Sequence, residues 1–283
     1  MNDRPKLTSP SQVRAWIEAQ QFLPSKVLGQ NFLIDENILR IMVDSAEVGP
    51  DDGVLEVGPG LGVLTDPLTL AAARVVAVEK DKRLAAHLGE VLREKSNLTL
   101  INRDALEVDF AELKQAHGLS RFVSNLPYSV GSRILVECFK LAEGFDRLVV
   151  TVQLEVAERL AAKPDTPDYG LLSVWAQLDY EVKITKRVAH SCFYPRPQVT
   201  SAIVVLKKTR ARRAGLPNPA RFDALIKHTF SMRRKQLGTS LSSFRFSGLT
   251  QSPAEAAMRA GLDPKRRPET LTVDEWVQLD AGL

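Results

Sequence analysis

The apolar positions of the chain follow two different periods in two successive regions. Between about residues 50 and 155, short β-branched apolar runs alternate with longer helical patterns, which is typical of a parallel sheet with crossover helices. The runs that we expect to form strands are 54–57, 74–79, 98–102, 121–124 and 148–153. The stretches that we expect to form helices between them include 81–95, with Asp81 as its N-cap, and 130–142.

Beyond this region the pattern continues briefly and then changes. After a further helical stretch through Trp175, the segments 182–188 and 202–206 are expected to complete the sheet as an antiparallel pair, and 219–280 shows only helical periods. Gly215, Pro217 and Pro219 mark the expected linker. The sequence therefore predicts an N-terminal extension over 1–28 with one helix around 13–20, an α/β domain over 29–212, and a small all-helical domain over 213–283.

Length and composition place the chain among ordinary globular proteins. Its 283 residues, 44% of them hydrophobic, are enough for one substantial core and a smaller second one. No apolar stretch approaches the roughly 18 residues of a membrane span, and no signal pattern opens the chain, so we expect a cytoplasmic protein without a membrane partner. Two cysteines and four histidines are scattered without metal-ligand spacing, so no metal site is expected.

The net charge is informative only when the chain is divided. Residues 207–283 hold 15 Lys and Arg against 7 Asp and Glu, a net charge of +8, whereas residues 1–206 hold 23 against 27, a net charge of −4. The basic residues of the last quarter form clusters at 207–213, 233–235 and 265–267. Such clusters suit the phosphate backbone of a nucleic acid, although basic runs are also common on ordinary solvated surfaces.

A glycine-rich turn follows the first predicted strand. It reads Glu-Val-Gly-Pro-Gly-Leu-Gly over 56–62 and places Gly58 and Gly60 where a ligand can approach the backbone, after which Val63 is expected to open a helix. Such turns also serve dinucleotides. Here the spacing is G-x-G-x-G rather than G-x-G-x-x-G, and Pro59 offers no N–H to a pyrophosphate. The turn therefore favours a nucleoside without phosphate.

Acidic residues follow the next two strands. Glu79 ends its strand 21 residues after Gly58, which is about where an acid accepts both hydroxyls of a ribose, although charged residues end many strands. Asp104 lies just past the third strand, where its carboxylate would accept a hydrogen bond from an adenine amino group. Asp104 and Glu107 also have capping-box spacing, so Asp104 is equally suited to begin a helix, and the two roles are compatible.

Asn125, Leu126, Pro127 and Tyr128 follow the fourth strand and carry the most specific chemistry. The exocyclic amine of adenine is a poor nucleophile, so an enzyme that alkylates it must hold the nitrogen by its hydrogens. The Asn125 side-chain oxygen and the Leu126 carbonyl are the two acceptors, Pro127 stiffens the loop, and Tyr128 can stack on the base. An ordinary Asn-Pro turn leaving a strand is the alternative interpretation.

Together these four strand ends fit S-adenosylmethionine. That molecule has an adenine, a ribose with both hydroxyls, and no phosphate. Its methyl sulfonium is already an activated electrophile, so transfer to nitrogen needs alignment and desolvation more than a strong base, and no catalytic histidine is required.

With these residues in place, the chain over about 24–280 resembles the ribosomal RNA adenine dimethyltransferase family, most closely its bacterial KsgA-type members. The resemblance rests on the Gln-Asn-Phe-Leu element at 30–33, the glycine turn, Glu79, Asp104 and the loop at 125–128. It implies a Rossmann-like class I methyltransferase sheet with a C-terminal helical domain. It also implies that Asn31, Leu33 and Asn125 contact the cofactor.

Two further segments extend the resemblance. The segment 193–199 resembles the family's Phe-x-Pro-x-Pro-Lys-Val element, which implies that Phe193 sandwiches the target adenine opposite Tyr128, with Gln198 in place of the usual Lys. The segment 230–237 resembles the Phe-x-x-Arg-Arg-Lys-x-Leu element and implies that Arg233, Arg234 and Lys235 contact RNA. Here Gly238 and Thr239 replace the usual Arg-Asn.

The resemblance implies dimethylation of N6 on two adjacent adenosines in the 3′-terminal hairpin of small-subunit (16S) ribosomal RNA, within a pre-ribosomal particle and by a monomer. One alternative is a large-subunit ribosomal RNA methyltransferase of the antibiotic-resistance type, against which the element at 233–237 argues. Another is a ribosome assembly factor that acts mainly by binding RNA, which an intact loop at 125–128 disfavours. A nicotinamide-dependent dehydrogenase conflicts with the glycine spacing.

Overall fold

The computed structural model describes residues 9–25, 28–249 and 252–283. The chain divides into two compact units, which we call the sheet unit (residues up to 157 and 183–207) and the helical unit (158–182 and 208–283). The predicted N-terminal extension lies partly outside the described residues. Within it, α1 (Pro10–Ala19) confirms the helix expected around 13–20 and is capped by Ser9, whose Oγ accepts a hydrogen bond from Gln12 N at 3.3 Å.

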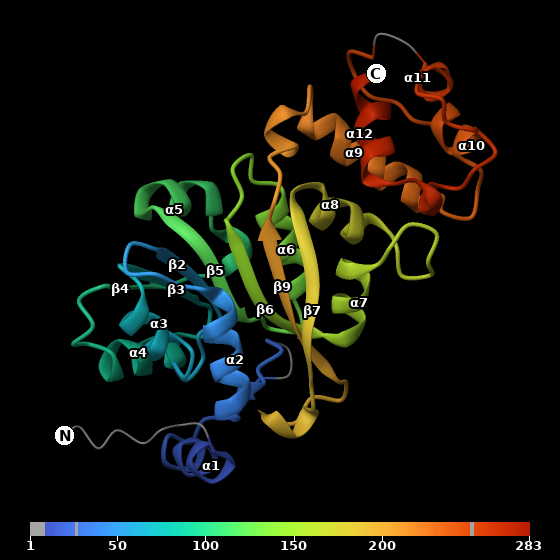
Figure 1. Cartoon of the computed structure of the whole chain (residues 1–283). Coiled ribbons are helices and arrows are strands. Elements are labelled where there is room, and N and C mark those ends of the chain that lie inside the picture. Colours follow the sequence, from blue (N-terminus) through green and yellow to red (C-terminus); the bar gives the residue numbers. More distant parts are fainter. Residues whose placement is uncertain (1–8, 26–27, 250–251) are drawn as a thin grey trace. The chain divides into compact units, whose positions relative to one another are not determined.

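A seven-stranded sheet forms the centre of the sheet unit (Figure 1). The first five strands in spatial order pair in parallel, and the sixth is antiparallel to the fifth. The spatial order is β4 (Leu98–Asn102), β3 (Arg74–Glu79), β2 (Gly53–Val57), β5 (Leu119–Asn125), β6 (Arg147–Gln153), β9 (Ser201–Lys208) and β7 (Tyr180–Val188). All seven predicted strands are present, and the α/β class is confirmed.

The helices of the sheet unit follow the crossover pattern. They are α2 (Glu36–Ala46), α3 (Thr65–Ala71), α4 (Lys82–Val91), α5 (Phe110–His117) and α6 (Gly131–Phe139). Asp81 caps α4 as predicted, with Oδ1 accepting from the backbone N of Arg83 at 2.9 Å. The prediction that Val63 opens a helix is wrong by two residues: Gly62 N donates to Pro59 O at 2.9 Å, so the glycine turn continues and α3 begins at Thr65.

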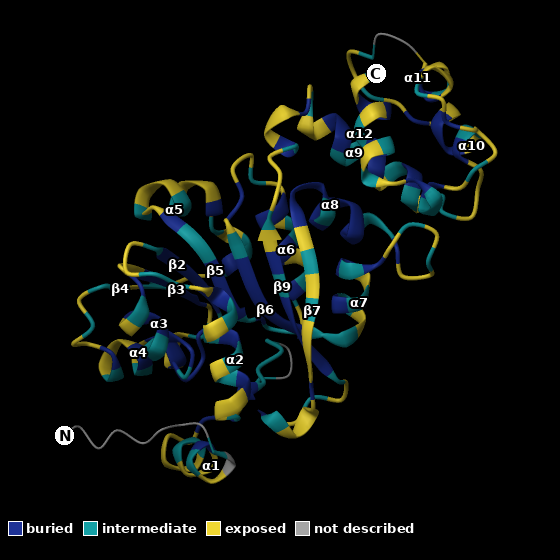
Figure 2. Cartoon of the chain, viewed as in Figure 1, coloured by how far each residue is buried: buried dark blue, intermediate teal, exposed yellow. Residues whose placement is uncertain are grey.

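The centre of the sheet is buried on both faces (Figure 2). Every residue of β2 is buried, as are five of the seven residues of β6, and these strands read as continuous apolar runs because helices cover both sides. The edge strand β7 alternates between buried or partly buried and exposed positions. Helix α2 packs on β5 and β6, and its Ile38, Met42 and Ala46 join the main core.

The helical unit contains α8 (Leu171–Asp179), α9 (Pro219–Ser231), α10 (Leu237–Ser242), α11 (Pro253–Arg259) and α12 (Val273–Ala281), and α7 (Leu154–Ala161) straddles the border. The predicted boundary was a single one at 213, whereas the structure groups 158–182 with the C-terminal helices. Tyr169 donates its hydroxyl hydrogen to Leu271 O at 2.9 Å, and Asp179 Oδ1 accepts from Arg213 N at 3.1 Å. The helical periodicity of the sequence does not predict such long-range hydrogen bonds.

Two further observations concern the described residues alone. None of their helices combines the length and the apolar composition that crossing a membrane requires. Nor do these residues bring three or more His, Cys, Asp or Glu side chains into a group suited to a metal ion.

Candidate active site

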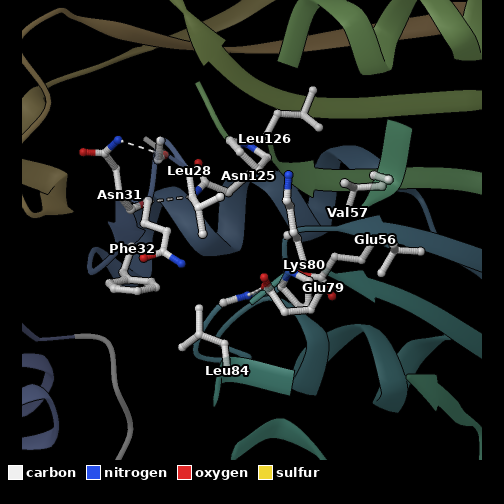
Figure 3. Close-up of a pocket in the computed structure, with 18 of the residues that line it drawn as sticks. Leu28, Asn31, Phe32, Glu56, Val57, Glu79, Lys80, Leu84, Asn125 and Leu126 are labelled. Atoms are coloured by element: carbon white, nitrogen blue, oxygen red, sulfur yellow. Dashed lines mark hydrogen bonds between the residues drawn. The ribbon is translucent and has the colours of Figure 1, made fainter. Parts of the chain in front are cut away.

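A pocket with a volume of about 170 Å³ opens at the carboxyl ends of β2, β3 and β5 (Figure 3). Parallel strands bring their carboxyl ends to one edge of a sheet, which is why residues distant in sequence meet there. Figure 3 shows Asn31 and Asn125 beside one another, with Glu79 and Leu84 across the pocket. All seven residues predicted to contact the cofactor line this pocket: Asn31, Leu33, Gly58, Gly60, Glu79, Asp104 and Asn125.

Three backbone amides of the glycine turn donate to other groups of the protein. Gly58 N donates to Val78 O at 2.9 Å, Gly60 N to Glu79 Oε2 at 3.1 Å, and Gly62 N to Pro59 O at 2.9 Å. Gly58 and Gly60 have φ values of +70° and +58°, in the left-handed region that favours glycine. These three amides are therefore engaged within the protein, which favours a ligand without phosphate.

The glycine turn also touches two other segments of the site. A Cβ added to Gly58 would lie 3.0 Å from Pro127 Cγ, and one added to Gly60 would lie 3.1 Å from Phe32 Cδ1. A side chain at either position would therefore collide with a neighbouring loop. The loop at 125–128 thus lies directly against the glycine turn, as the proposed arrangement of the site requires.

Glu79 is held rigidly in the pocket wall. Its side chain is 6% exposed, and its two carboxylate oxygens accept from Gly60 N at 3.1 Å and from Asp81 N at 2.8 Å. Burial raises the pKa of Glu79, and the backbone N–H groups that it accepts from oppose that shift. A carboxylate oxygen can accept more than one hydrogen bond, so Glu79 retains capacity to bind ribose hydroxyls.

Asp104 has a partner that the sequence pattern did not reveal. Its Oδ1 accepts from Leu106 N at 3.0 Å and caps a short 3₁₀ helix, η1 (Ala105–Glu107), while its Oδ2 accepts from Lys80 Nζ at 2.6 Å. The Lys80 ammonium group, through this hydrogen bond, lowers the pKa of Asp104. The N-cap role considered for Asp104 is confirmed for this short helix, whereas the longer α5 begins later with Asp109 as its own N-cap. Lys80 itself lines the pocket.

The side-chain amide of Asn125 has one satisfied end and one free end. Its Nδ2 donates to the backbone carbonyl of Asn31 at 3.0 Å, which orients the amide. Its Oδ1 is buried and has no hydrogen-bond partner among the described residues. Native proteins seldom leave a buried amide oxygen unsatisfied, because the lost hydrogen bond costs about 1 to 3 kcal/mol. The free oxygen is therefore positioned to accept from a ligand N–H group.

A second, smaller hollow lies on the other side of the loop at 125–128. It shares Leu126 and Pro127 with the main pocket, adds Tyr128 and Gln153, and has a volume of about 10 Å³, which holds at most one water. The Tyr128 hydroxyl hydrogen-bonds with Ser201 Oγ. Burial raises the pKa of Tyr128 to about 12, so its hydroxyl stays neutral at physiological pH.

Phe193 lies beside Tyr128 because of strand pairing. The two-residue strands β1 (Phe32–Leu33) and β8 (Phe193–Tyr194) are antiparallel, with Leu33 opposite Phe193. The rings of Phe193 and Tyr128 meet edge to face, with centroids 6.2 Å apart and planes at 72°. A base sandwiched between two parallel rings needs about 7 Å, twice a contact of about 3.5 Å. The rings must therefore move apart before a base enters.

The N-terminal helix packs behind residues that line the pocket, a contact that the sequence pattern did not reveal. Val13 of α1 and Phe22 pack in one cluster with the pocket residues Phe32, Leu61 and Leu84. The available signal was the apolar spacing of 13–17 followed by an aromatic residue. That spacing cannot show which surface the helix covers.

Two arginines anchor this N-terminal segment. Arg83 lies over the ring of Phe22 at 5.2 Å and donates to the carbonyl of Gln20 at 2.5 Å. Arg14 lies over the ring of Tyr194 at 5.4 Å. The segment is thus tied both to α4, which follows Glu79, and to the strand that carries Phe193.

In the helical unit, the basic clusters separate into structural and exposed residues. Arg213 is 2% exposed and pairs with Asp223, Arg212 pairs with Asp274, and Arg266 makes two hydrogen bonds to Glu275. These three arginines stabilise the fold. Only part of the clusters at 207–213 and 265–267 is therefore available to contact a nucleic acid. The exposed members include Arg234, Lys235, Lys265 and Arg267.

Backbone hydrogen bonds bring the cluster at 233–235 close to the cluster at 265–267. Leu237 N donates to Arg266 O at 2.6 Å, and Gly238 N donates to Pro264 O at 2.9 Å. A Cβ on Gly238 would lie 3.0 Å from Pro264 Cβ, so a larger residue at this position would require Pro264 to shift. Of the predicted RNA contacts, Arg233 is partly buried and donates to Thr166 O at 3.2 Å, whereas Arg234 and Lys235 are exposed.

Comparison with known proteins identifies the family of the chain. A family model for ribosomal RNA adenine dimethylase matches residues 22–279. Ribosomal RNA small subunit methyltransferase A of Clostridium perfringens (strain SM101 / Type A) is 40% identical over 267 residues, covering 94% of this chain and 93% of that protein.

Solved structures share the fold. A dimethyladenosine transferase from Plasmodium falciparum aligns with a TM-score of 0.75 at 22% identity, covering 88% of this chain and 95% of that one. The 23S rRNA methyltransferase ErmE aligns with a TM-score of 0.63 at 28% identity, covering 89% of this chain and 99% of that one. The sheet is that of class I methyltransferases, as expected. The chain belongs to the ribosomal RNA adenine dimethylase family, whose members are S-adenosylmethionine-dependent methyltransferases.

Proposed function

We propose that the protein transfers methyl groups from S-adenosylmethionine to N6 of two adjacent adenosines in the 3′-terminal hairpin of small-subunit ribosomal RNA. One observation carries the proposal: the unpaired, buried Oδ1 of Asn125 in the wall of a pocket suited to a phosphate-free nucleoside. The similarity over 93% of a small-subunit methyltransferase A supports the choice of ribosomal subunit.

The residues of the pocket fit S-adenosylmethionine. Glu79 would accept from both ribose hydroxyls, Asp104 from the adenine amino group, and Asn31 and Leu33 would line the opposite wall, beside Gly58 and Gly60 of the turn. When bound, the cofactor supplies a methyl group on a positively charged sulfur. The protein then has to align and desolvate the acceptor nitrogen rather than activate it strongly.

The loop at 125–128 would position the target base. Asn125 Oδ1 and the Leu126 carbonyl accept the two N6 hydrogens, which directs the nitrogen lone pair away from the acceptors. Pro127, packed on Gly58, fixes the loop. Tyr128 and Phe193 stack on the base once their rings separate, which contributes roughly 1 to 3 kcal/mol per base. The methylated nitrogen is acidic and loses its proton to water or to one of these oxygens.

The RNA must present its target adenosines unstacked, at a cost of a few kcal/mol that a hairpin loop lowers. Arg233, Arg234 and Lys235 would contact the surrounding phosphates. We place the reaction on a pre-ribosomal particle in the cytoplasm and expect the protein to act as a monomer.

Site mapping tests the proposal against its alternatives. The protein is incubated with radiolabelled S-adenosylmethionine and either naked small-subunit RNA, immature small subunits or large subunits, and modified adenosines are then mapped. We expect N6-dimethyladenosine at the paired adenosines of the small subunit. Label in the large subunit would instead favour the activity named for ErmE. Incorporation into none of the substrates would favour an assembly factor that acts by binding.

Charge reversal at Arg234 and Lys235 should weaken RNA binding without harming the fold. Both side chains are exposed, so R234E together with K235E removes two phosphate contacts. The slope of log affinity against log salt should fall by roughly 1 per lost contact. Fluorescence anisotropy with the RNA hairpin measures this slope. The control is R103E, which changes an exposed arginine of the sheet unit far in sequence from the cluster. An equal decrease of the salt slope in R103E would contradict the assignment of Arg234 and Lys235 as RNA contacts.

Removal of one aromatic ring should detach the N-terminal helix from the pocket. Phe22 is 2% exposed and contacts Trp16, Phe32 and Arg83, so Phe22→Ala costs roughly 3 to 5 kcal/mol of local packing. We expect faster amide exchange in α1 and about tenfold weaker binding of S-adenosylmethionine, since Phe32 and Leu84 lose their outer support. The neighbouring Leu23→Ala is the matched control, because Leu23 is 85% exposed. Equal exchange rates in both variants would refute the role of α1.

A further inference from the structure

Glu56 is a buried acid in the cofactor pocket to which no role has yet been given. It lies in β2, two residues before Gly58, its side chain is 1% exposed, and it lines the pocket. Its Oε2 has no hydrogen-bond partner among the described residues. An unpartnered carboxyl group at such depth is costly unless it is neutral or receives a cation.

The charges around the pocket are unbalanced. Its titratable lining residues are Glu56, Glu79, Lys80 and Asp104. Lys80 and Asp104 pair with each other at 2.6 Å, which leaves two buried carboxyl groups, Glu56 and Glu79, without a cationic side chain among the described residues that line the pocket.

The other groups that face Glu56 do not supply a positive charge. From α3 it meets the neutral hydroxyl of Thr65, and β5 contributes the neutral amide of Asn125 to the pocket. Beyond Glu79 lies Asp81, a further carboxyl group whose Oδ2 accepts from Gln30 Nε2 at 3.0 Å. The interior of the pocket is thus acidic.

We propose that Glu56 recognises the positive charge of the cofactor: its carboxyl group is neutral in the free protein and releases its proton to solvent when the cationic cofactor binds. This proposal rests on the proposed use of S-adenosylmethionine, which carries a sulfonium and an ammonium against one carboxylate. In the free protein the neutral acid avoids a buried, uncompensated charge. In the complex the ionised acid faces a cation.

The ionisation behaviour of Glu56 is consistent with this role. Burial raises the pKa of Glu56 to about 8, the negative charge of Glu79 raises it further, and the Thr65 hydroxyl opposes part of the shift. At pH 7 the free protein therefore holds the proton, and a nearby cation favours its loss. Affinity for a cationic ligand should increase with pH, by up to about tenfold per pH unit below 8, and level off above it.

Calorimetry in paired buffers tests the inference. The full-length protein is titrated at pH 7 with S-adenosylmethionine, S-adenosylhomocysteine or 5′-methylthioadenosine in buffers that differ in ionisation enthalpy, so that the dependence of the heat on buffer counts the protons released. We expect close to one proton with S-adenosylmethionine and none with the uncharged methylthioadenosine. Glu56→Gln should release far fewer protons and bind S-adenosylmethionine with little dependence on pH. Glu107→Gln, the same substitution at an exposed residue, should behave as the wild type.

S-adenosylhomocysteine shows which positive charge of the cofactor Glu56 recognises, because this ligand keeps the ammonium but lacks the sulfonium. Proton release with it assigns Glu56 to the ammonium, and absence of release assigns it to the sulfonium. Binding of S-adenosylmethionine without proton release, or equal release by Glu56→Gln, would overturn the inference and leave the proposed function intact. No binding of S-adenosylmethionine by the wild type would instead contradict the proposed function.

A second measurement uses the wild-type protein alone and so does not depend on a variant that folds. With carboxyl-labelled glutamate, ¹³C spectra of the free protein should show one glutamate titrating near pH 8, and saturating S-adenosylmethionine should move that titration to lower pH. A titration unaffected by the cofactor would overturn the inference.

Discussion

Asn125→Ala should lower methyl transfer at least about 100-fold at saturating cofactor and RNA, because the acceptor that aligns the N6 hydrogens is lost. Asn125 Oδ1 is a buried acceptor in the pocket wall without a partner among the described residues, next to Leu126, whose carbonyl is the other proposed acceptor. Single-turnover kinetics with the RNA hairpin measures the chemical step. Cofactor binding should change little, since the variant loses only the neutral hydrogen bond from Nδ2 to Asn31 O, worth about 1 kcal/mol.

Asn125→Asp separates the acceptor from the donor. It keeps an oxygen in place but cannot donate to Asn31 O, so the 31–33 segment should loosen while some transfer remains. The expected order of turnover is wild type, Asn125→Asp, then Asn125→Ala. Retained turnover in Asn125→Ala together with lost cofactor binding would mean that Asn125 belongs to the cofactor site alone.

Glu79→Ala should show the reverse pattern, with cofactor affinity reduced by about 100-fold or more. The variant would lose the two hydrogen bonds that the ribose hydroxyls donate to the Glu79 carboxylate, each worth about 1.5 to 3 kcal/mol. The variant also leaves Gly60 N and Asp81 N without their acceptor, which loosens the glycine turn. Calorimetry with S-adenosylmethionine measures the affinity, and circular dichroism shows whether the fold persists.

Glu79→Gln is the matched control for Glu79→Ala. It keeps the size of the side chain and one acceptor oxygen, so the loss of affinity should be smaller. At saturating cofactor both variants should recover much of their turnover, because the N6 acceptors at 125–126 are unaltered. Unchanged affinity in Glu79→Ala would exclude Glu79 from ribose binding.

The order of elements and the positions of the strand ends were readable from the sequence. Gly58, Glu79, Asp104 and Asn125 follow successive apolar runs, and the rule that parallel strands end at one edge predicts that they meet. Strand periodicity and turn residues are local properties, so they can be recognised from the sequence alone. The same local character explains the error at α3, whose exact start depends on a single hydrogen bond within the turn.

The roles of the basic residues were not readable in this way. Arg234 and Arg266 look alike in sequence, yet one is exposed and the other makes two hydrogen bonds to Glu275. Which arginine becomes structural depends on where an acidic residue from another helix lies. The unit boundary was obscured for the same reason, since Tyr169 and Leu271 are 102 residues apart in the chain.

The sequence by itself determined the chemistry available at each strand end, because residue type and spacing are properties of neighbours along the chain. Only the tertiary structure decided how those groups are oriented and charged. The Asn125 amide is oriented by a carbonyl 94 residues away, Val13 and Phe22 pack behind the pocket residues Phe32 and Leu84, and burial beside Glu79 raises the pKa of Glu56. Burial and long-range partners set hydrogen-bond direction and proton affinity, and neither is encoded in a local pattern.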